Sequence, residues 1–337
     1  MIRKMILYLS EPGSVLRKKG GRYIVELNDK RIGEIPAEKL EAVVLFSGTH
    51  ITSPCMVSLF EMGIPVTWLS SRGKFFGRAE LTGHVNIERQ REQFRRSEDE
   101  EFCLGLAKKF INAKIRNSLV LLRRYNRNLE MDAVDSIINE IQKNLSGIDT
   151  ATSMSVLSGV EGYTSRLYFQ ALSEMIRGEF KFKGRTRQPP KDPFNSLLSF
   201  GYTLLMYEIY TAIVNRRLHP YMGFLHRIRR GHPALASDLM EEWRAVLVDT
   251  LVLSQVQRGS INWEDFDVDA EEGGVYLRKG ASREFIKKFE ERLRTENKYV
   301  AEQNPISFRD AIDHQVLMLV KSIEESDPGL YKPVIVR

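Results

Sequence analysis

The pattern of apolar and polar residues changes its period once along the chain. Up to about residue 80, short apolar runs alternate with glycine, asparagine and aspartate, a pattern that predicts strands joined by tight turns. The runs lie at residues 5–9, 14–27, 30–36, 42–46, 64–70 and 74–80. Between them, residues 53–63 fit a short helix that ends at Gly63.

From about residue 97 onward, apolar residues recur at spacings of three and four, the period of a helix with one buried face. The segments with this period are 102–125, 133–145, 153–176, 195–218, 235–253, 282–295 and 308–323. The sequence therefore predicts an α+β fold, with a small β-rich N-terminal domain over residues 1–80 and a larger all-α domain over residues 97–337. The polar residues 81–96 are expected to form a linker or the start of the first helix.

Composition narrows the class of protein only slightly. The 337 residues include 50 Lys and Arg against 44 Asp and Glu, a formal charge of +6 that mildly favours polyanionic partners. Cys55 and Cys103 form no CxxC or Cys/His pattern, which indicates two reduced, structural thiols. The N-terminus does not fit a signal peptide, and no apolar run approaches the roughly 18 residues of a membrane span. We therefore expect a soluble, cytoplasmic protein with no membrane partner.

The stretch SGVEGYTSRLY, residues 158–168, places Glu161 between Gly159 and Gly162 in an otherwise helical run. A glycine inside a helix costs about 1 kcal/mol relative to alanine. Two of them beside one acid suggest that another helix, another stretch of backbone or a ligand approaches closely. The alternative is a surface glutamate at a helix kink.

A second candidate region, residues 219–244, runs from a loop through His226 into a predicted helix. On that helix Asp238 and Glu241 are three residues apart, so they share one face. Carboxylates with one imidazole suit Mg²⁺ or Mn²⁺ and make a poor structural zinc site. The alternative is an ordinary loop histidine before an amphipathic helix whose acids pair with Arg or Lys.

Basic residues gather in two further segments. Residues 104–130 carry seven Lys and Arg against one acid, and residues 180–193 form a basic loop that contains the pair Pro189 and Pro190. Such runs are commonly solvated faces. They also suit contact with a phosphate backbone without readout of base sequence.

Four segments, GVEGYTSRLYF, DPFNSLLSFGYTLL, GFLH and LASDLMEEWR, occur in this order after the β-rich region. Together they resemble the CRISPR-associated endonuclease family one, the spacer-acquisition integrase, over essentially the whole chain. The resemblance implies that Glu161, His226 and Glu241 are catalytic and bind one divalent metal, Mg²⁺ or Mn²⁺. It implies that Asp238 orients a ligand or helps to bind the metal, and that Glu161 lies at a crowded point where helices meet.

The reaction implied by the resemblance is transesterification, in which the 3′-hydroxyl of a short DNA fragment attacks a phosphodiester at the edge of a CRISPR repeat. The implied assembly consists of homodimers, each formed through the β-rich domain, bridged by a dimer of the small family-two protein. Contacts to the double-stranded fragment and to the repeat are expected from Arg166, Lys181, Lys183, Arg185, Arg187, Arg227, Arg229 and Arg230.

Two alternatives remain open on the sequence. One is a metal-dependent nuclease that cuts branched or single-stranded DNA without integration. The other is a non-catalytic scaffold that binds nucleic acid, for which Glu161 would be dispensable.

Overall fold

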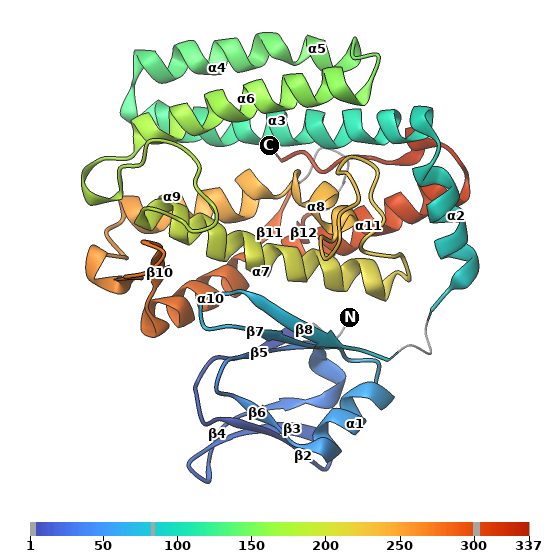
Figure 1. Cartoon of the computed structure of the whole chain (residues 1–337), viewed down its shortest axis with the longest axis vertical. Coiled ribbons are helices and arrows are strands. Elements are labelled where there is room, and N and C mark those ends of the chain that lie inside the picture. The colour runs from blue at the N-terminus through green and yellow to red at the C-terminus, as the bar shows by residue number, and fades with distance from the viewer. Residues whose placement is uncertain (1–4, 82–84, 299–303, 337) are drawn as a thin grey trace. The chain divides into compact units, whose positions relative to one another are not determined.

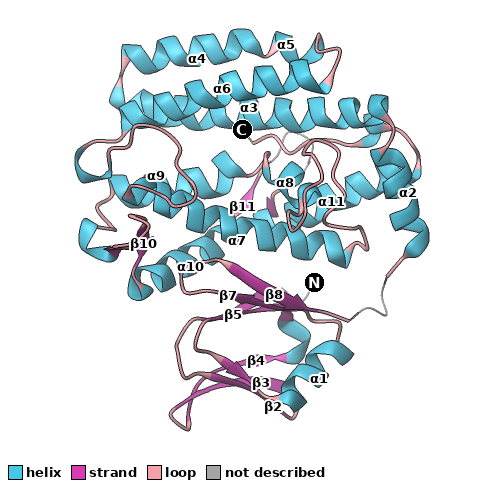
Figure 2. Cartoon of the chain, viewed as in Figure 1, coloured by secondary structure: helices cyan, strands magenta, loops and turns pink. Residues whose placement is uncertain are grey.

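The computed structural model describes residues 5–81, 85–298 and 304–336, and the chain divides into two compact units, Met1–Val85 and Asn86–Arg337. The boundaries expected from sequence also take in residues 1–4, 82–84, 299–303 and 337, which lie outside the described residues. The first unit is rich in strands and the second is largely helical, as the hydrophobic pattern predicts (Figures 1 and 2).

The described part of the strand-rich unit contains two four-stranded sheets and one α-helix, α1 (Ser53–Glu61). One sheet has the order β1 (Met5–Leu9), β5 (Leu40–Phe46), β7 (Val66–Leu69) and β8 (Phe75–Ala79). Its first three strands are parallel and β8 is antiparallel to β7. The other sheet has the order β4 (Lys30–Pro36), β3 (Arg22–Leu27), β2 (Val15–Lys19) and β6 (His50–Ile51).

Turn chemistry and burial explain why these strands form. Asn28 and Asp29 have φ values of 50° and 60°, the left-handed pair that a two-residue hairpin between β3 and β4 requires. The core takes side chains from both sheets and from α1, among them Leu16, Leu45 and Leu59, all fully buried. The apolar runs found in the sequence are therefore the inward faces of two sheets.

The helical unit begins with α2 (Ile87–Ser97), within the segment for which the sequence left linker and helix open. Its other long helices are α3 (Glu100–Leu129), α4 (Asp132–Asn144), α6 (Met154–Met175), α7 (Pro193–Asn215), α10 (Lys279–Leu293) and α11 (Phe308–Glu324). The short helices are α5 (Ser146–Asp149), α8 (Ala234–Met240) and α9 (Thr250–Gln257). Side chains of Asp99, Ser153 and Asp192 cap the first turns of α3, α6 and α7.

Two details of this unit differ from the prediction. The segment 235–253 is not one regular helix, because α8 ends at Met240 and residues Arg244–Asp249 are π-helical before α9 begins. The unit also contains two small antiparallel ladders, β9 (Phe266–Val268) with β10 (Val275–Leu277) and β11 (Glu296–Asn297) with β12 (Ile306–Ser307). These strands are two or three residues long, too short to produce a visible alternation in the sequence.

Helix α7 is long and apolar enough to cross a membrane by composition, but 67% of its most apolar window is buried inside the unit. This is the burial of a core helix, and α7 packs against α8 and α11. Helices α3, α4 and α6 pack together, and Figure 1 shows them as neighbouring layers of the same unit. The face of α6 that carries Glu161 and the residues that follow α8 border one pocket.

Candidate active site

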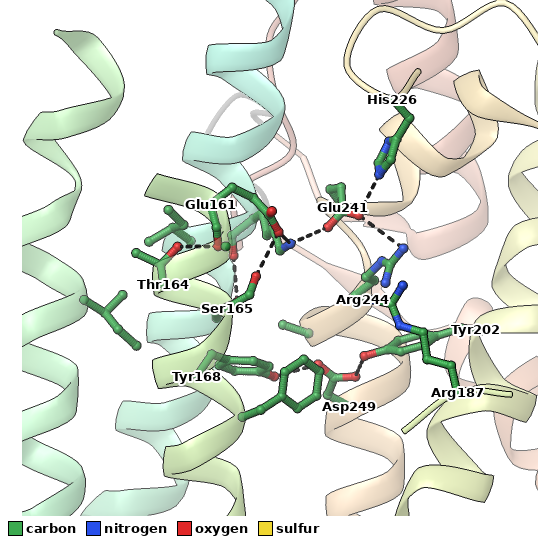
Figure 3. A pocket seen from close by; sticks show the side chains of 17 residues that line it. Glu161, Thr164, Ser165, Tyr168, Arg187, Tyr202, His226, Glu241, Arg244 and Asp249 are labelled. Carbon is green, nitrogen blue, oxygen red and sulfur yellow. Dashed lines mark hydrogen bonds and ion pairs between the residues drawn. The ribbon is translucent and has the colours of Figure 1, made fainter. Parts of the chain in front are cut away.

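A pocket of about 380 Å³ opens in the helical unit, bordered by α3, α6, α7 and the chain that follows α8. It brings together three of the residues singled out in the sequence, Glu161, His226 and Glu241 (Figure 3). Its other charged or hydroxyl-bearing side chains are Lys114, Ser118, Thr164, Ser165, Tyr168, Arg187, Tyr202, Arg244 and Asp249.

Glu161 and Glu241 share one cation, the ammonium of Lys114 on α3. Lys114 Nζ forms an ion pair with Glu161 Oε1 and lies 2.8 Å from Glu241 Oε2. Ser165, one turn further along α6, donates a hydrogen bond of 2.9 Å to Glu161 Oε1. The two carboxylates, which come from separate helices, therefore face a common point.

Glu241 is the more deeply buried of the two acids, with a side chain 5% exposed against 29% for Glu161. Burial raises the pKa of Glu241, but the charges of Arg244, Lys114 and His226 outweigh it and lower the pKa to about 2. Arg244 follows Glu241 by three residues, and its Nη2 atom lies 3.1 Å from Glu241 Oε1. Glu241 is thus held ionised inside the protein.

His226 is oriented by Asp238. The His226 Nδ1 atom lies 2.7 Å from Asp238 Oδ1, and Nε2 lies 3.9 Å from Glu241 Oε1. Burial lowers the pKa of His226, while the hydrogen bond and charge of Asp238 and the charge of Glu241 raise it, with a net increase. A carboxylate at Nδ1 fixes the tautomer of the neutral ring, with the proton on Nδ1. Nε2 is therefore the nitrogen that can bind a metal ion.

Asp238 itself lies behind the histidine and does not border the pocket. It is fully buried, and besides His226 Nδ1 its two oxygens accept backbone N–H groups of Phe224, Leu225 and His226 at 2.6–3.0 Å. Gly223 allows this closure, because a Cβ there would lie 2.6 Å from Asp238 Oδ2. The acid that the sequence placed beside Glu241 thus shapes the loop of His226.

The glycines beside Glu161 do not mark a close helix crossing, so that part of the expectation is wrong. A Cβ built on Gly159 or on Gly162 would meet nothing within 4 Å. Gly162 is exposed and borders the pocket. The glycines therefore do not mark a close approach by another helix or by backbone, and at Gly162 the open space borders the pocket.

The floor of the pocket carries a third acid, Asp249, at the end of the π-helical segment. Its two oxygens accept hydrogen bonds of 2.6 Å from the hydroxyls of Tyr168 and Tyr202 (Figure 3). Burial raises the pKa of Asp249 to about 6, although the two hydroxyls and Arg244 oppose the increase. The guanidinium of Arg244 also lies 5.0 Å from the centre of the Tyr202 ring, so Tyr202 supports both Asp249 and the arginine that pairs with Glu241.

The end of the chain supports the same region. Asn117 on α3 donates hydrogen bonds of 2.8 Å to the carbonyl oxygens of Glu242 and Val334. The carboxylate of Glu242 accepts from the Tyr331 hydroxyl at 2.5 Å and from the Val334 N–H at 2.6 Å. The backbone next to Glu241 is therefore fastened to α3 and to the C-terminal segment at once.

The basic residues expected to contact DNA occupy two kinds of position. Seven of them are exposed, and one of these, Arg187, also borders the pocket: Arg166, Lys181, Lys183, Arg187, Arg227, Arg229 and Arg230. Arg185 is held within the unit, where it donates to Asn195 Oδ1 at 2.8 Å and to Ser199 Oγ at 3.0 Å. Asn195 and Arg185 together anchor the basic loop to α7.

Among the described residues, no three His, Cys, Asp or Glu side chains already form a group that could hold a metal ion. The donor set at the pocket nevertheless fits a divalent cation of the Mg²⁺ or Mn²⁺ type, since it offers two carboxylates and one imidazole nitrogen. Glu241 Oε2 is buried, and the ammonium of Lys114 lies 2.8 Å from it. A cation between Glu161 and Glu241 would take the place of Lys114.

Three charged residues of the pocket were not assigned to the site from the sequence: Lys114, which was counted only among the basic residues of 104–130, Arg244 and Asp249. Lys114 did leave a signal, because it lies in the buried stripe of α3, three residues after Ile111 and four before Ser118. A lysine in such a stripe needs a buried acid or an opening. Asp249 likewise follows four buried apolar residues, 245–248. Nothing local distinguishes Arg244 from an arginine on a helix surface.

Two carboxylates, an imidazole and several cations around one pocket define a site of the kind found in nucleases and other phosphoryl-transfer enzymes. The family model described as "CRISPR associated protein Cas1" matches residues 7–291. The chain therefore belongs to the Cas1 family of CRISPR-associated endonucleases, the family that its sequence motifs resemble.

Relatives with this name align over nearly the whole chain. The CRISPR-associated endonuclease Cas1 of Mycobacterium tuberculosis is 33% identical over 96% of this chain and 95% of its own length. A Cas1 protein of Thermus thermophilus is 35% identical over 98% of both chains. A CRISPR-associated exonuclease Cas4/endonuclease Cas1 fusion of Geobacter sulfurreducens is 37% identical over 97% of this chain, which spans 60% of the fusion.

Solved structures share the fold. A Cas1 protein from Thermotoga maritima superposes with a TM-score of 0.80 at 23% identity, over 95% of this chain and 97% of its own. A casposase bound to an integration product gives a TM-score of 0.80 at 22% identity, over 96% of this chain and 91% of its own. A chain of a Cas6-RT-Cas1–Cas2 complex gives 0.84 at 25% identity, over 99% of this chain and 36% of its own. The succession of a strand-rich unit and a helical unit is thus the fold of the family.

Proposed function

We propose that this protein is a metal-dependent DNA endonuclease and integrase that inserts short DNA fragments into a CRISPR array. The observation that carries the proposal is the convergence of Glu161, Glu241 and His226, from three separate segments, on one pocket. Two relatives at 33% and 35% identity carry the name endonuclease. A structural neighbour titled as bound to an integration product supports strand joining.

In this proposal Glu161, Glu241 and His226 hold one Mg²⁺ or Mn²⁺ ion. The bound cation would supply Lewis-acid chemistry, lowering the pKa of a hydroxyl and offsetting negative charge on a phosphodiester. Glu241 is suited to this task because its low pKa keeps it ionised. Asp238 keeps the imidazole Nδ1 occupied, so that neutral His226 offers Nε2 toward the pocket.

The cations around the pocket suit DNA as the substrate. Arg187 borders the pocket, and the basic residues Arg227, Arg229 and Arg230 closely follow His226 in the chain. Contacts of this type neutralise phosphates and position the strand without reading its sequence. We assign Arg185 to the support of the basic loop, since its guanidinium is used by Asn195 and Ser199.

The proposed assembly is a homodimer that works with the small Cas2 protein in the cytoplasm. A DNA fragment has two ends, so joining both to the array requires two pockets. A structural neighbour belongs to a complex whose title includes Cas2, which supports that partner.

The test incubates the purified protein with a labelled DNA fragment bearing free 3′-hydroxyls and a supercoiled plasmid carrying a CRISPR repeat, with and without Cas2. Reactions contain Mn²⁺, Mg²⁺ or EDTA. Wild type is expected to transfer label covalently to the plasmid only when metal is present. Glu161→Gln is expected to lower strand-transfer activity by more than about a hundredfold. Changing only a residue that supports a metal ligand costs up to about a hundredfold, and Glu161 is proposed to be a ligand itself.

The matched control is Glu174→Gln, an exposed acid on the same helix, which should retain wild-type activity. Nicking that depends on metal and on Glu161 without strand transfer would favour the alternative of a simple nuclease. DNA binding without either reaction, equal in wild type and Glu161→Gln, would favour a non-catalytic scaffold.

A further inference from the structure

Lys114 occupies a position that the proposed reaction does not explain. It lies on α3 with a side chain only 17% exposed, and its ammonium contacts Glu161 Oε1 and Glu241 Oε2. The neighbouring cation, Arg244, pairs with the other oxygen of Glu241, Oε1. Lys114 is therefore the group that joins the two carboxylates.

The same two acids are those proposed to bind the divalent cation. An ammonium and a divalent cation in contact with Glu161 Oε1 and Glu241 Oε2 would repel each other and compete for electron pairs of the same two oxygens. Contact of the two acids with Lys114 therefore opposes their contact with a metal ion.

We propose that Lys114 is an internal counter-ion of the metal site, which competes with the divalent cation and lowers the affinity of the site for it. The proposal rests on the function proposed above. Without Lys114, two ionised carboxylates would face each other with less compensation, which destabilises the folded protein. With Lys114 in place that repulsion is offset, and a metal ion must compete with the ammonium and draw the two oxygens away from it.

Displacement has a consequence for the substrate. The lysine is tethered to α3, and its side chain borders the same pocket, so the released ammonium stays beside the site. There the ammonium can pair with a phosphate, whose negative charge takes the place of the two carboxylates. Binding of a DNA phosphate and binding of the metal would thus favour each other through Lys114.

The test measures Mn²⁺ binding by isothermal titration calorimetry, with the electron paramagnetic resonance signal of free Mn²⁺ as a second readout, on the full chain without DNA. Lys114→Met should bind Mn²⁺ about tenfold or more tightly than wild type, because a like charge has been removed from the site. In EDTA its Tm should fall by about 3 °C or more. Lys114→Arg keeps the charge and should stay near the wild-type affinity.

The matched control is Lys108→Met, on the same helix, whose ammonium donates to the backbone oxygen of Asp149 at 2.9 Å and does not border the pocket. It should leave Mn²⁺ affinity unchanged. Equal or weaker Mn²⁺ binding by Lys114→Met, when wild type binds and Glu161→Gln does not, would overturn the role of Lys114 and leave the metal site standing. Binding that is absent in wild type and in Lys114→Met, or unaffected by Glu161→Gln, would overturn the metal site itself.

Discussion

Asp249 offers a direct test of the electrostatics of the pocket floor. It is 1% exposed, and its pKa is raised from 3.8 to about 6, first by burial and against the hydrogen bonds of Tyr168 and Tyr202. In the unfolded chain the carboxyl has its ordinary pKa. Between about pH 4 and pH 6 the folded state therefore holds more protons than the unfolded state, so the free energy of unfolding falls as pH rises.

The magnitude follows from the shift of about 2 pKa units. Each unit corresponds to about 1.4 kcal/mol, so ionised Asp249 lowers the free energy of unfolding by about 3 kcal/mol once the pH is well above 6. Roughly 2 kcal/mol of this should be lost between pH 4 and pH 7, since the effect has already begun at pH 4.

The perturbation is Asp249→Asn, which removes the ionisation but can still accept one tyrosine hydroxyl. Urea unfolding of both proteins at half-unit steps from pH 4 to pH 8 gives the difference in unfolding free energy at each pH. Between pH 4 and pH 7, the unfolding free energy of Asp249→Asn should rise by about 2 kcal/mol relative to that of wild type. In Tyr202→Phe, loss of a donor should raise the pKa of Asp249 further and move the transition to higher pH. Parallel pH profiles for wild type and Asp249→Asn would refute the reasoning.

Two further predictions concern the histidine loop and the glycines. Asp238→Asn replaces one of two oxygens that accept four donors, so the free energy of unfolding should drop by about 3 kcal/mol or more. The control Asp99→Asn, at the cap of α3, should change the free energy of unfolding very little. Similar losses for the two variants in chemical denaturation would contradict this prediction. Gly162→Ala meets no atom within 4 Å and should raise the free energy of unfolding by up to about 1 kcal/mol. Gly201→Ala should lower it by about 1–3 kcal/mol, because its Cβ would lie 2.6 Å from Val248 Cγ1. Thermal unfolding that ranks the two alanine variants equally would show that open space at Gly162 has been misjudged.

Much of the fold can be predicted from the sequence because the signals for it are local. The change from short apolar runs to a three-and-four spacing near residue 97 separates strands from helices, and the turn at Asn28 and Asp29 needs only the backbone freedom of those residues. The short strands β9 to β12 and the π-helical segment could not be predicted from the sequence, since two or three residues carry no periodicity and a π-helical segment of six residues is too short to show a period of its own.

The sequence by itself determined the class of protein and a short set of candidate residues, because Glu161, His226 and Glu241 lie in short motifs whose order along the chain resembles that of the family. Only the tertiary structure decided what surrounds them. It brought Lys114 from α3 between the two acids, turned Asp238 away from the pocket to hold the histidine loop, and placed Asp249 in the floor. The reason is that a hydrophobic pattern specifies which face of a helix is buried, whereas the partner of a buried charge depends on which helices pack together.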